Sequence, residues 1–174
     1  MTVSSGPRDE RLQAELELRE LRRPDCDSGV ALALAAFAEL CGFKGGEEIA
    51  NDMWASLMAA LRSDGSRSGA PSLTERASLG FELLRATRTV GLGVLDLKPA
   101  AAGIEAEAYL YLVEDERGHG LGSMLLSLLE AEARARGAAA LFFRVPPGAR
   151  NGKNLGEQNG YRARSLKMVR LEPL

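Results

Sequence analysis

Polar and apolar residues follow one another along this chain in a pattern that predicts strands and helices. Residues 15–22 alternate between polar and apolar, which predicts a first strand, while their high helix propensity favours a helix instead. An apolar run over residues 30–41, ended by a glycine, predicts a first helix. A second helix is expected to open at the Gly45-Gly46 pair, and residues 63–72, rich in Ser and Gly, predict a loop after it. This second helix carries an apolar stripe that we interpret as core: Ile49, Met53, Leu57 and Leu61, with Trp54 and Met58 beside it.

Three strand-like runs occupy the middle of the chain, over residues 79–87, 89–97 and 106–113. Polar residues around Arg88 predict a turn between the first two runs, and residues 99–103 separate the second from the third. Three such runs in succession predict an antiparallel meander.

The last third of the chain predicts a helix between two strands. Residues 121–136 form an amphipathic helix that Gly137 ends, and a strand over 138–145 follows. A strand, a helix and a strand in this order favour a parallel pair with a right-handed crossover. A short helix over 153–158 and a closing strand over 161–171 complete the pattern. The apolar face of the long helix comprises Leu125, Leu128, Leu129 and Ala133.

Length and composition indicate one globular domain. The chain has 174 residues, of which 45% are hydrophobic and 26% charged. We expect residues 1–12 to form a flexible N-terminal tail and residues 13–174 to form a single domain. A net charge of −2 argues against a nucleic-acid partner, which normally needs a basic face, but leaves room for a local anion site.

Cysteine and histidine usage argues against a metal centre. Cys26 and Cys41 match no zinc or redox spacing, and His119 is the lone histidine. The first eleven residues lack the apolar run of a signal peptide, and the longest apolar run, residues 30–38, is too short to span a bilayer. These features predict a cytoplasmic protein with no membrane segment.

A glycine-rich turn between the third middle run and the long helix carries the clearest chemistry. Gly118, Gly120 and Gly122 stand at alternate positions, behind Arg117 and ahead of Ser123. The first N–H groups of a helix lack partners inside it and carry partial positive charge, so an anion docks there. Glycine lets the backbone come close, arginine adds a charged fork, and serine adds a hydroxyl. The turn therefore predicts a phosphate or pyrophosphate ligand.

The same turn has other interpretations. Glycines between a strand and a helix often serve tight geometry alone, and G-x-G-x-G by itself is a weak signal. Gly118 and Gly120 also begin a dinucleotide-binding fingerprint, but the turn lies too late for a doubly wound sheet, and the acidic residue expected on the next strand is absent.

The run Arg117-Gly118-His119-Gly120-Leu121-Gly122 resembles the signature of the GNAT acetyltransferase superfamily, which is Arg or Gln, two residues, Gly, one residue, then Gly or Ala. The order of elements over residues 14–174 is similar too, and Asn159-Gly160-Tyr161 resembles the family's late Leu-Gly-Phe element. The resemblance implies an α/β (strictly α+β) acyl-CoA N-acyltransferase fold, with a mixed central sheet, splayed parallel strands and helices on both faces.

The resemblance also implies an acetyl-CoA site without a metal. In the family, the signature amides and the arginine hold the CoA pyrophosphate, and the strand before them pairs with the pantetheine. An asparagine that the family has near Ala149 corresponds to Asn151 or Asn154 after a small length change. The implied cofactor-binding residues are Leu112, Val113, Arg117, Gly118, His119, Gly120, Leu121, Gly122, Ser123, Asn151 and Asn154.

The catalytic positions of the family carry over less well. Gly156 stands where relatives often have a tyrosine acid, and Arg144 stands where some have a carboxylate base. Glu107 and Glu105 are the candidate bases that remain, and alternation places them on one strand face with Tyr109. A solvated strand edge is an equally good interpretation of the two glutamates.

Three functions are compatible with the sequence. The first is an N-acetyltransferase that moves an acetyl group from acetyl-CoA to a primary amine of a small molecule or protein by direct attack. The second is a non-catalytic acyl-CoA-binding or regulatory module that lacks the usual acid. The third is the dinucleotide-binding protein. An exposed last strand would also allow a homodimer, and nothing in the sequence identifies the acceptor.

Overall fold

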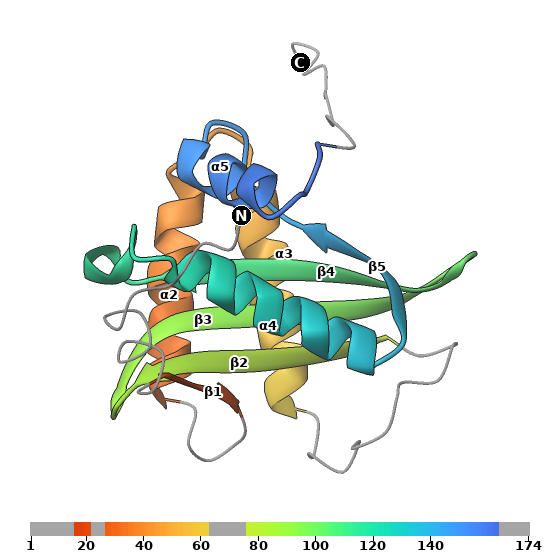
Figure 1. Cartoon of the computed structure of the whole chain (residues 1–174), viewed down its shortest axis with the longest axis horizontal. Helices are drawn as coiled ribbons and strands as arrows, with labels where there is room; N and C mark the ends of the chain where they lie inside the picture. Colours follow the sequence, from red (N-terminus) through yellow and green to blue (C-terminus); the bar gives the residue numbers. More distant parts are fainter. Residues whose placement is uncertain (1–15, 22–26, 63–75, 164–174) are drawn as a thin grey trace, which may run out of the picture.

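Within the described residues, five strands form one sheet at the centre of the molecule (Figure 1). The computed structural model describes residues 16–21, 27–62 and 76–163. The strands lie side by side in their order along the chain. They are β1 (Leu16–Glu20), β2 (Ala77–Arg85), β3 (Arg88–Ala100), β4 (Gly103–Leu112) and β5 (Ala138–Phe143). The first four pair antiparallel, which confirms the predicted meander.

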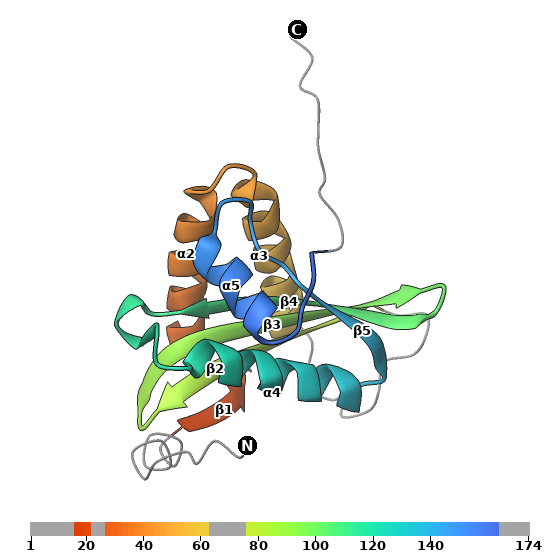
Figure 2. The ribbon, with the colours of Figure 1, turned by 45° about the horizontal axis from the view of Figure 1, so that its top comes forward.

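Helices cover both faces of the sheet (Figures 1 and 2). On one face lie α2 (Asp27–Cys41) and α3 (Gly46–Arg62), whose apolar side chains pack with Leu92, Val94 and Tyr109. On the other face lies α4 (Leu121–Ala135), which packs its leucines against the opposite sides of the same strands. This alternation of strand residues between two cores accounts for the nearly continuous burial of β2 and β3.

The helical predictions are confirmed in type and largely in extent. The predicted stripe of the second helix is buried at Ile49, Met53, Leu57 and Leu61. A short 3-10 helix, η1 (Glu114–Glu116), precedes the glycine turn, and α5 (Arg150–Gln158) starts three residues earlier than predicted. None of the helices among the described residues combines the length and apolar character needed to cross a membrane.

The parallel pair of β4 and β5 separates part of the way along. The two strands pair from Ile104 opposite Ala138 to Ala108 opposite Phe143. One further bond runs from the Arg144 N–H to the Ala108 carbonyl at 2.9 Å. Beyond this point β4 continues through residues 109–112, while β5 leaves the sheet toward α5 (Figure 2). The predicted parallel pairing and splay are therefore confirmed.

Two strand predictions need correction or lie outside the described residues. Pro99 was expected in a loop, but it lies within β3 opposite Ile104. The strand tolerates it because the described pairing of β2 with β3 starts at Ala77 opposite Leu97, so no described neighbour on that side needs a hydrogen bond at position 99. Of the predicted closing strand, residues 161–163 have no regular structure, and the remainder lies outside the described residues, as do the loop 63–72 and the tail 1–12.

Candidate functional site

The glycine turn has a backbone shape that favours glycine. Gly118 has a φ of 82°, and Gly120, the N-cap of α4, has a φ of 80°. A Cβ added to either residue would meet nothing within 4 Å, so space is not the constraint. L-residues avoid this left-handed region because Cβ approaches the following carbonyl. The turn consequently presents exposed main chain with no side chain over it at these two positions.

The amino end of α4 leaves several N–H groups without a helical acceptor. The bond from the Met124 N–H to the Gly120 carbonyl, 3.1 Å long, closes the first turn. The amides of residues 121–123 precede that bond, and no side chain caps them. The first turn of α4 also lacks an acidic residue, whereas α2 and α3 each carry one or two there. This end of α4 therefore retains both its unpaired donors and its positive dipole end for an anion.

Beyond Ala108, the edge of β4 that faces the β5 side carries main-chain groups without a strand partner among the described residues. Because the Ala108 carbonyl points to β5 and backbone groups alternate along a strand, Leu110 and Leu112 also direct their polar groups to that side. Val113 instead donates its N–H to the Val90 carbonyl of β3 at 3.1 Å. No strand in the described part of the chain pairs with residues 109–112 on the β5 side. We call this stretch the open edge of β4.

Arg117 contacts protein groups. Its Nε donates to the Leu112 carbonyl at 2.9 Å, and its two terminal nitrogens donate to the Glu39 carboxylate of α2 at 3.1 and 2.6 Å. The guanidinium also lies over the Tyr111 ring, 5.3 Å from its centre. Side chains in the Glu39 pair are 33% and 40% exposed, so this pair opens at little cost. A phosphate contact from Arg117 would require that opening.

The other residues implied for the cofactor lie around the same helix end. Ser123 accepts a hydrogen bond from the Asn159 side chain at 3.0 Å, which leaves its own hydroxyl proton free to donate. Gly122 faces Leu155 of α5, where an added Cβ would come within 3.2 Å of a methyl group. His119, Asn151 and Asn154 are exposed. Asn159 was not predicted as part of this site, since only the folded chain brings it to Ser123.

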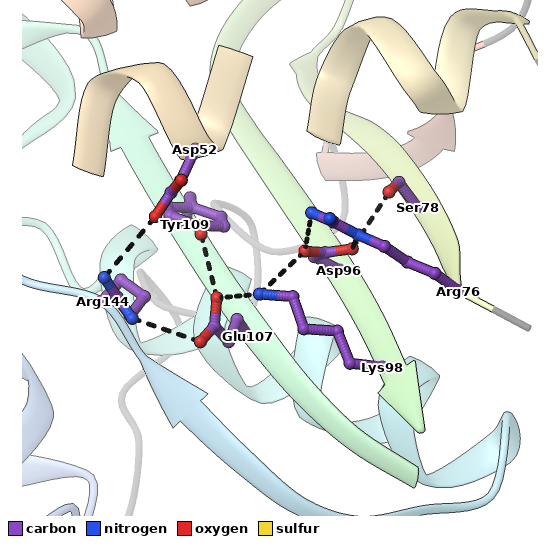
Figure 3. Close-up of polar contacts among 8 residues, drawn as sticks. All are labelled: Asp52, Arg76, Ser78, Asp96, Lys98, Glu107, Tyr109 and Arg144. Carbon is purple, nitrogen blue, oxygen red and sulfur yellow. Dashed lines mark hydrogen bonds and ion pairs between the residues drawn. The ribbon is translucent and has the colours of Figure 1, made fainter. Parts of the chain in front are cut away.

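A polar network lies on the α2/α3 side of the sheet, where β4 and β5 separate (Figure 3). The Glu107 carboxylate accepts hydrogen bonds from Lys98 at 2.7 Å, Tyr109 at 3.1 Å and Arg144 at 3.2 Å. Burial alone would raise the pKa of Glu107, but the Lys98 bond and the Arg144 charge outweigh it and hold the pKa below 4.5. Burial and the neighbouring Glu107 charge raise the pKa of Tyr109 above its usual range. Glu107 is thus a fixed anion and a weak proton acceptor.

Lys98 links Glu107 to a second, fully buried carboxylate. Asp96 is 0% exposed and accepts from Arg76 at 2.8 and 2.5 Å and from Ser78 at 3.1 Å. Lys98 lies 3.2 Å from it. Burial alone would raise the pKa of Asp96, but the bonds from Arg76 and Lys98 hold the pKa below 3.8. The network therefore crosses the sheet from Arg76, just before β2, through β3 and β4 to Arg144, just after β5, as alternating fixed charges.

The two predicted bases differ in position. Glu107 lies one residue before the end of the parallel pairing, and Glu105 lies within it, opposite Ala140. Both share a face with Tyr109, as alternation predicted. Only Glu107 reaches the point of separation. Gly156 is buried in α5 against Phe143 and Tyr161, so no tyrosine hydroxyl comes from that position.

Comparisons with known proteins agree with this geometry. Residues 48–161 match a family model described as "Acetyltransferase (GNAT) family". No curated protein sequence matches the chain significantly. Solved structures share the fold at low identity. A ribosomal-protein-alanine N-acetyltransferase from Brucella melitensis biovar Abortus 2308 has a TM-score of 0.60 at 19% identity, over 90% of this chain and 98% of that one.

Two other structures broaden the set of similar proteins. An aminoglycoside acetyltransferase from an uncultured soil metagenomic sample, in complex with sisomicin, has a TM-score of 0.64 at 12% identity, over 94% of this chain and 99% of that one. A putative acetyl transferase from Pyrococcus furiosus has a TM-score of 0.63 at 20% identity, over 91% and 100% of the two chains. At these identities the likeness establishes the fold.

Proposed function

The chain belongs to the acetyltransferase (GNAT) family, and from that premise we propose that it transfers an acetyl group from acetyl-CoA to a primary amine of a small molecule or protein. One observation carries the proposal. The uncapped end of α4 and the open edge of β4 lie next to each other, so main-chain donors for a diphosphate continue into main-chain groups for an amide-bearing chain. Similar structures include an aminoglycoside N-acetyltransferase solved in complex with CoA.

The proposed cofactor contacts follow from this arrangement. The amides of residues 118–123 would hold the pyrophosphate of CoA, with Ser123 adding a hydroxyl. The N–H and carbonyl of Leu110 and the N–H of Leu112 would pair with the pantetheine, because the Leu112 carbonyl already accepts from Arg117. Asn151 and Asn154 on α5 are proposed to lie along the same path. Arg117 would join the phosphate contacts once its pair with Glu39 opens.

Acetyl-CoA supplies the activated acetyl group when bound, and the chain's own residues orient the reactants. The path from α4 along the open edge leads to the point where β4 and β5 separate, beside Tyr109 and Arg144. Direct attack by an amine depends mainly on holding the two reactants together. Because its pKa is lowered, Glu107 is proposed to position Lys98 and Arg144 rather than to remove the proton.

Titration and turnover measurements test the proposal. Isothermal titration should show binding of acetyl-CoA, and thiol release over a panel of primary amines should identify acceptors. Binding without turnover for any amine would favour a non-catalytic acyl-CoA-binding module. That second function is motivated by Gly156, which stands where relatives often carry the tyrosine acid. Failure to bind acetyl-CoA would refute both.

A further inference from the structure

Asp52 differs from the other two carboxylates of the polar network. Asp96 and Glu107 each accept several hydrogen bonds from fixed cations and hydroxyls. Among the described residues Asp52 forms one ion pair, with Arg144 at 3.7 Å, which is longer than a hydrogen bond, and its charge also acts on the nearby Tyr109. Its side chain is 46% exposed, against 0% for Asp96 and 19% for Glu107. Asp52 therefore retains most of its capacity to accept hydrogen bonds.

The position of Asp52 places this capacity at the proposed reaction centre. Asp52 comes from α3 and points toward Arg144 and Tyr109 (Figure 3). Arg144 makes the last backbone bond between β5 and β4, and Tyr109 is the first β4 residue beyond the paired stretch. Asp52 thus faces the start of the open edge from the α2/α3 side, while α4 and its glycine turn lie on the other face.

The charges around Asp52 indicate what it would bind. Arg144 keeps its 3.2 Å bond to Glu107 if the longer contact with Asp52 is given up. The half-exposed Asp52 carboxylate is then free to accept from a cationic donor, and an alkylammonium carries three N–H groups. We propose that Asp52 binds the ammonium group of the acceptor and so selects amines that arrive as cations, each of which releases a proton to solvent before its free amine attacks. This inference rests on the proposed function, because it takes the separation of β4 and β5 as the place of transfer.

Binding measurements with matched small probes test this role. The chain, saturated with CoA, is titrated by NMR with L-alaninamide, with lactamide, in which a hydroxyl replaces the amine, and with L-alanine, which adds a carboxylate. At about pH 6.5 the α-amino group of alaninamide is protonated. We expect alaninamide to bind about tenfold or more tightly than lactamide, as a charge-assisted hydrogen bond requires.

Variants identify the group responsible. Asp52→Asn should remove the preference for alaninamide and leave the CoA dissociation constant unchanged, whereas Asp52→Glu should keep part of the preference. Glu47→Gln makes the same charge change at an exposed position of the same helix and should have no effect. Equal binding of alaninamide and lactamide by the wild-type chain, no detectable binding of alaninamide, or an unchanged preference in Asp52→Asn would overturn the inference.

Two further outcomes separate the alternatives. Strongest binding of alanine, increased by Asp52→Asn, would assign recognition to Arg144 and an acceptor carboxylate, and would also overturn the inference. A retained preference for alaninamide without thiol release from any amine would support Asp52 as the ammonium site while refuting the proposed transfer.

Discussion

Charge introduced at the N-cap of α4 is the most direct test of the diphosphate site. Gly120→Glu and Gly120→Gln both place a side chain at a φ of 80°, where the added Cβ meets nothing within 4 Å. Each should therefore lose about 1–2 kcal/mol of stability from backbone strain alone. For a chain of this length, that corresponds to a Tm decrease of roughly 2–8 °C. The two variants differ only in the carboxylate, so their difference in affinity isolates charge.

The magnitude of the charge effect follows from Coulomb's law. A carboxylate about 5 Å from one phosphate charge is repelled by roughly 1–3 kcal/mol for effective dielectric constants between about 80 and 20. Gly120→Glu should then bind acetyl-CoA about 5- to 150-fold more weakly than Gly120→Gln. Isothermal titration at two salt concentrations checks this, and the difference should shrink at high salt. Equal dissociation constants for the two folded variants would refute a diphosphate at this turn.

Three further predictions use other parts of the structure. Gly156→Ala should stabilise the chain by up to about 1 kcal/mol, because a Cβ there meets Phe143 and Tyr161 at ordinary distances of 3.5 and 3.6 Å. Gly152→Ala on the same helix should destabilise, since its Cβ would lie 2.8 Å from Val145, and urea unfolding of both variants checks the opposite signs. Glu39→Gln should raise acetyl-CoA affinity about two- to fivefold by freeing Arg117, and lower affinity on titration would show that the pair instead supports the turn. Glu107, whose pKa is lowered in the folded chain, contributes stability that is present above the ordinary carboxyl pKa and is lost as the pH falls through the lowered one. Glu107→Gln should therefore flatten the decline of unfolding free energy on acidification, and an unchanged slope would contradict this.

The sequence predicted most of the fold because its local signals agree with the tertiary structure. Apolar periodicity identified both helices on the α2/α3 face, and Gly137 marked the end of α4. The prediction that Pro99 lies in a loop was wrong, because a strand tolerates a proline beyond the paired part of its neighbour. The extent of that pairing is not encoded in any local pattern. The closing strand lies mostly outside the described residues, so it stays a prediction.

The polar contacts of the site were beyond local reasoning for the same physical reason. Arg117 and Glu39 are 78 positions apart, and Arg144 and Glu107 are 37 apart. Asp52 enters the site because α3 packs over the separating strands. Each of these pairs depends on register and helix placement rather than on spacing along the chain.

The two halves of the proposed site therefore place different demands on the sequence. The proposed cofactor half would use main-chain groups, and glycines at positive φ make such a turn recognisable in the sequence because few other residues adopt that backbone. The proposed acceptor half would use side chains from α3, β3, β4 and the end of β5. Such side chains can be exchanged for others as long as the charges in the network still balance. The resemblance implies that Arg144 stands where some relatives have a carboxylate, and here Glu107 across the parallel pair supplies the opposite charge. Such an exchange keeps the strands together but removes a free base. The acceptor therefore has to be inferred from the charged side chains of this chain. Among the carboxylates of the network, Asp52 has the weakest contact with other side chains.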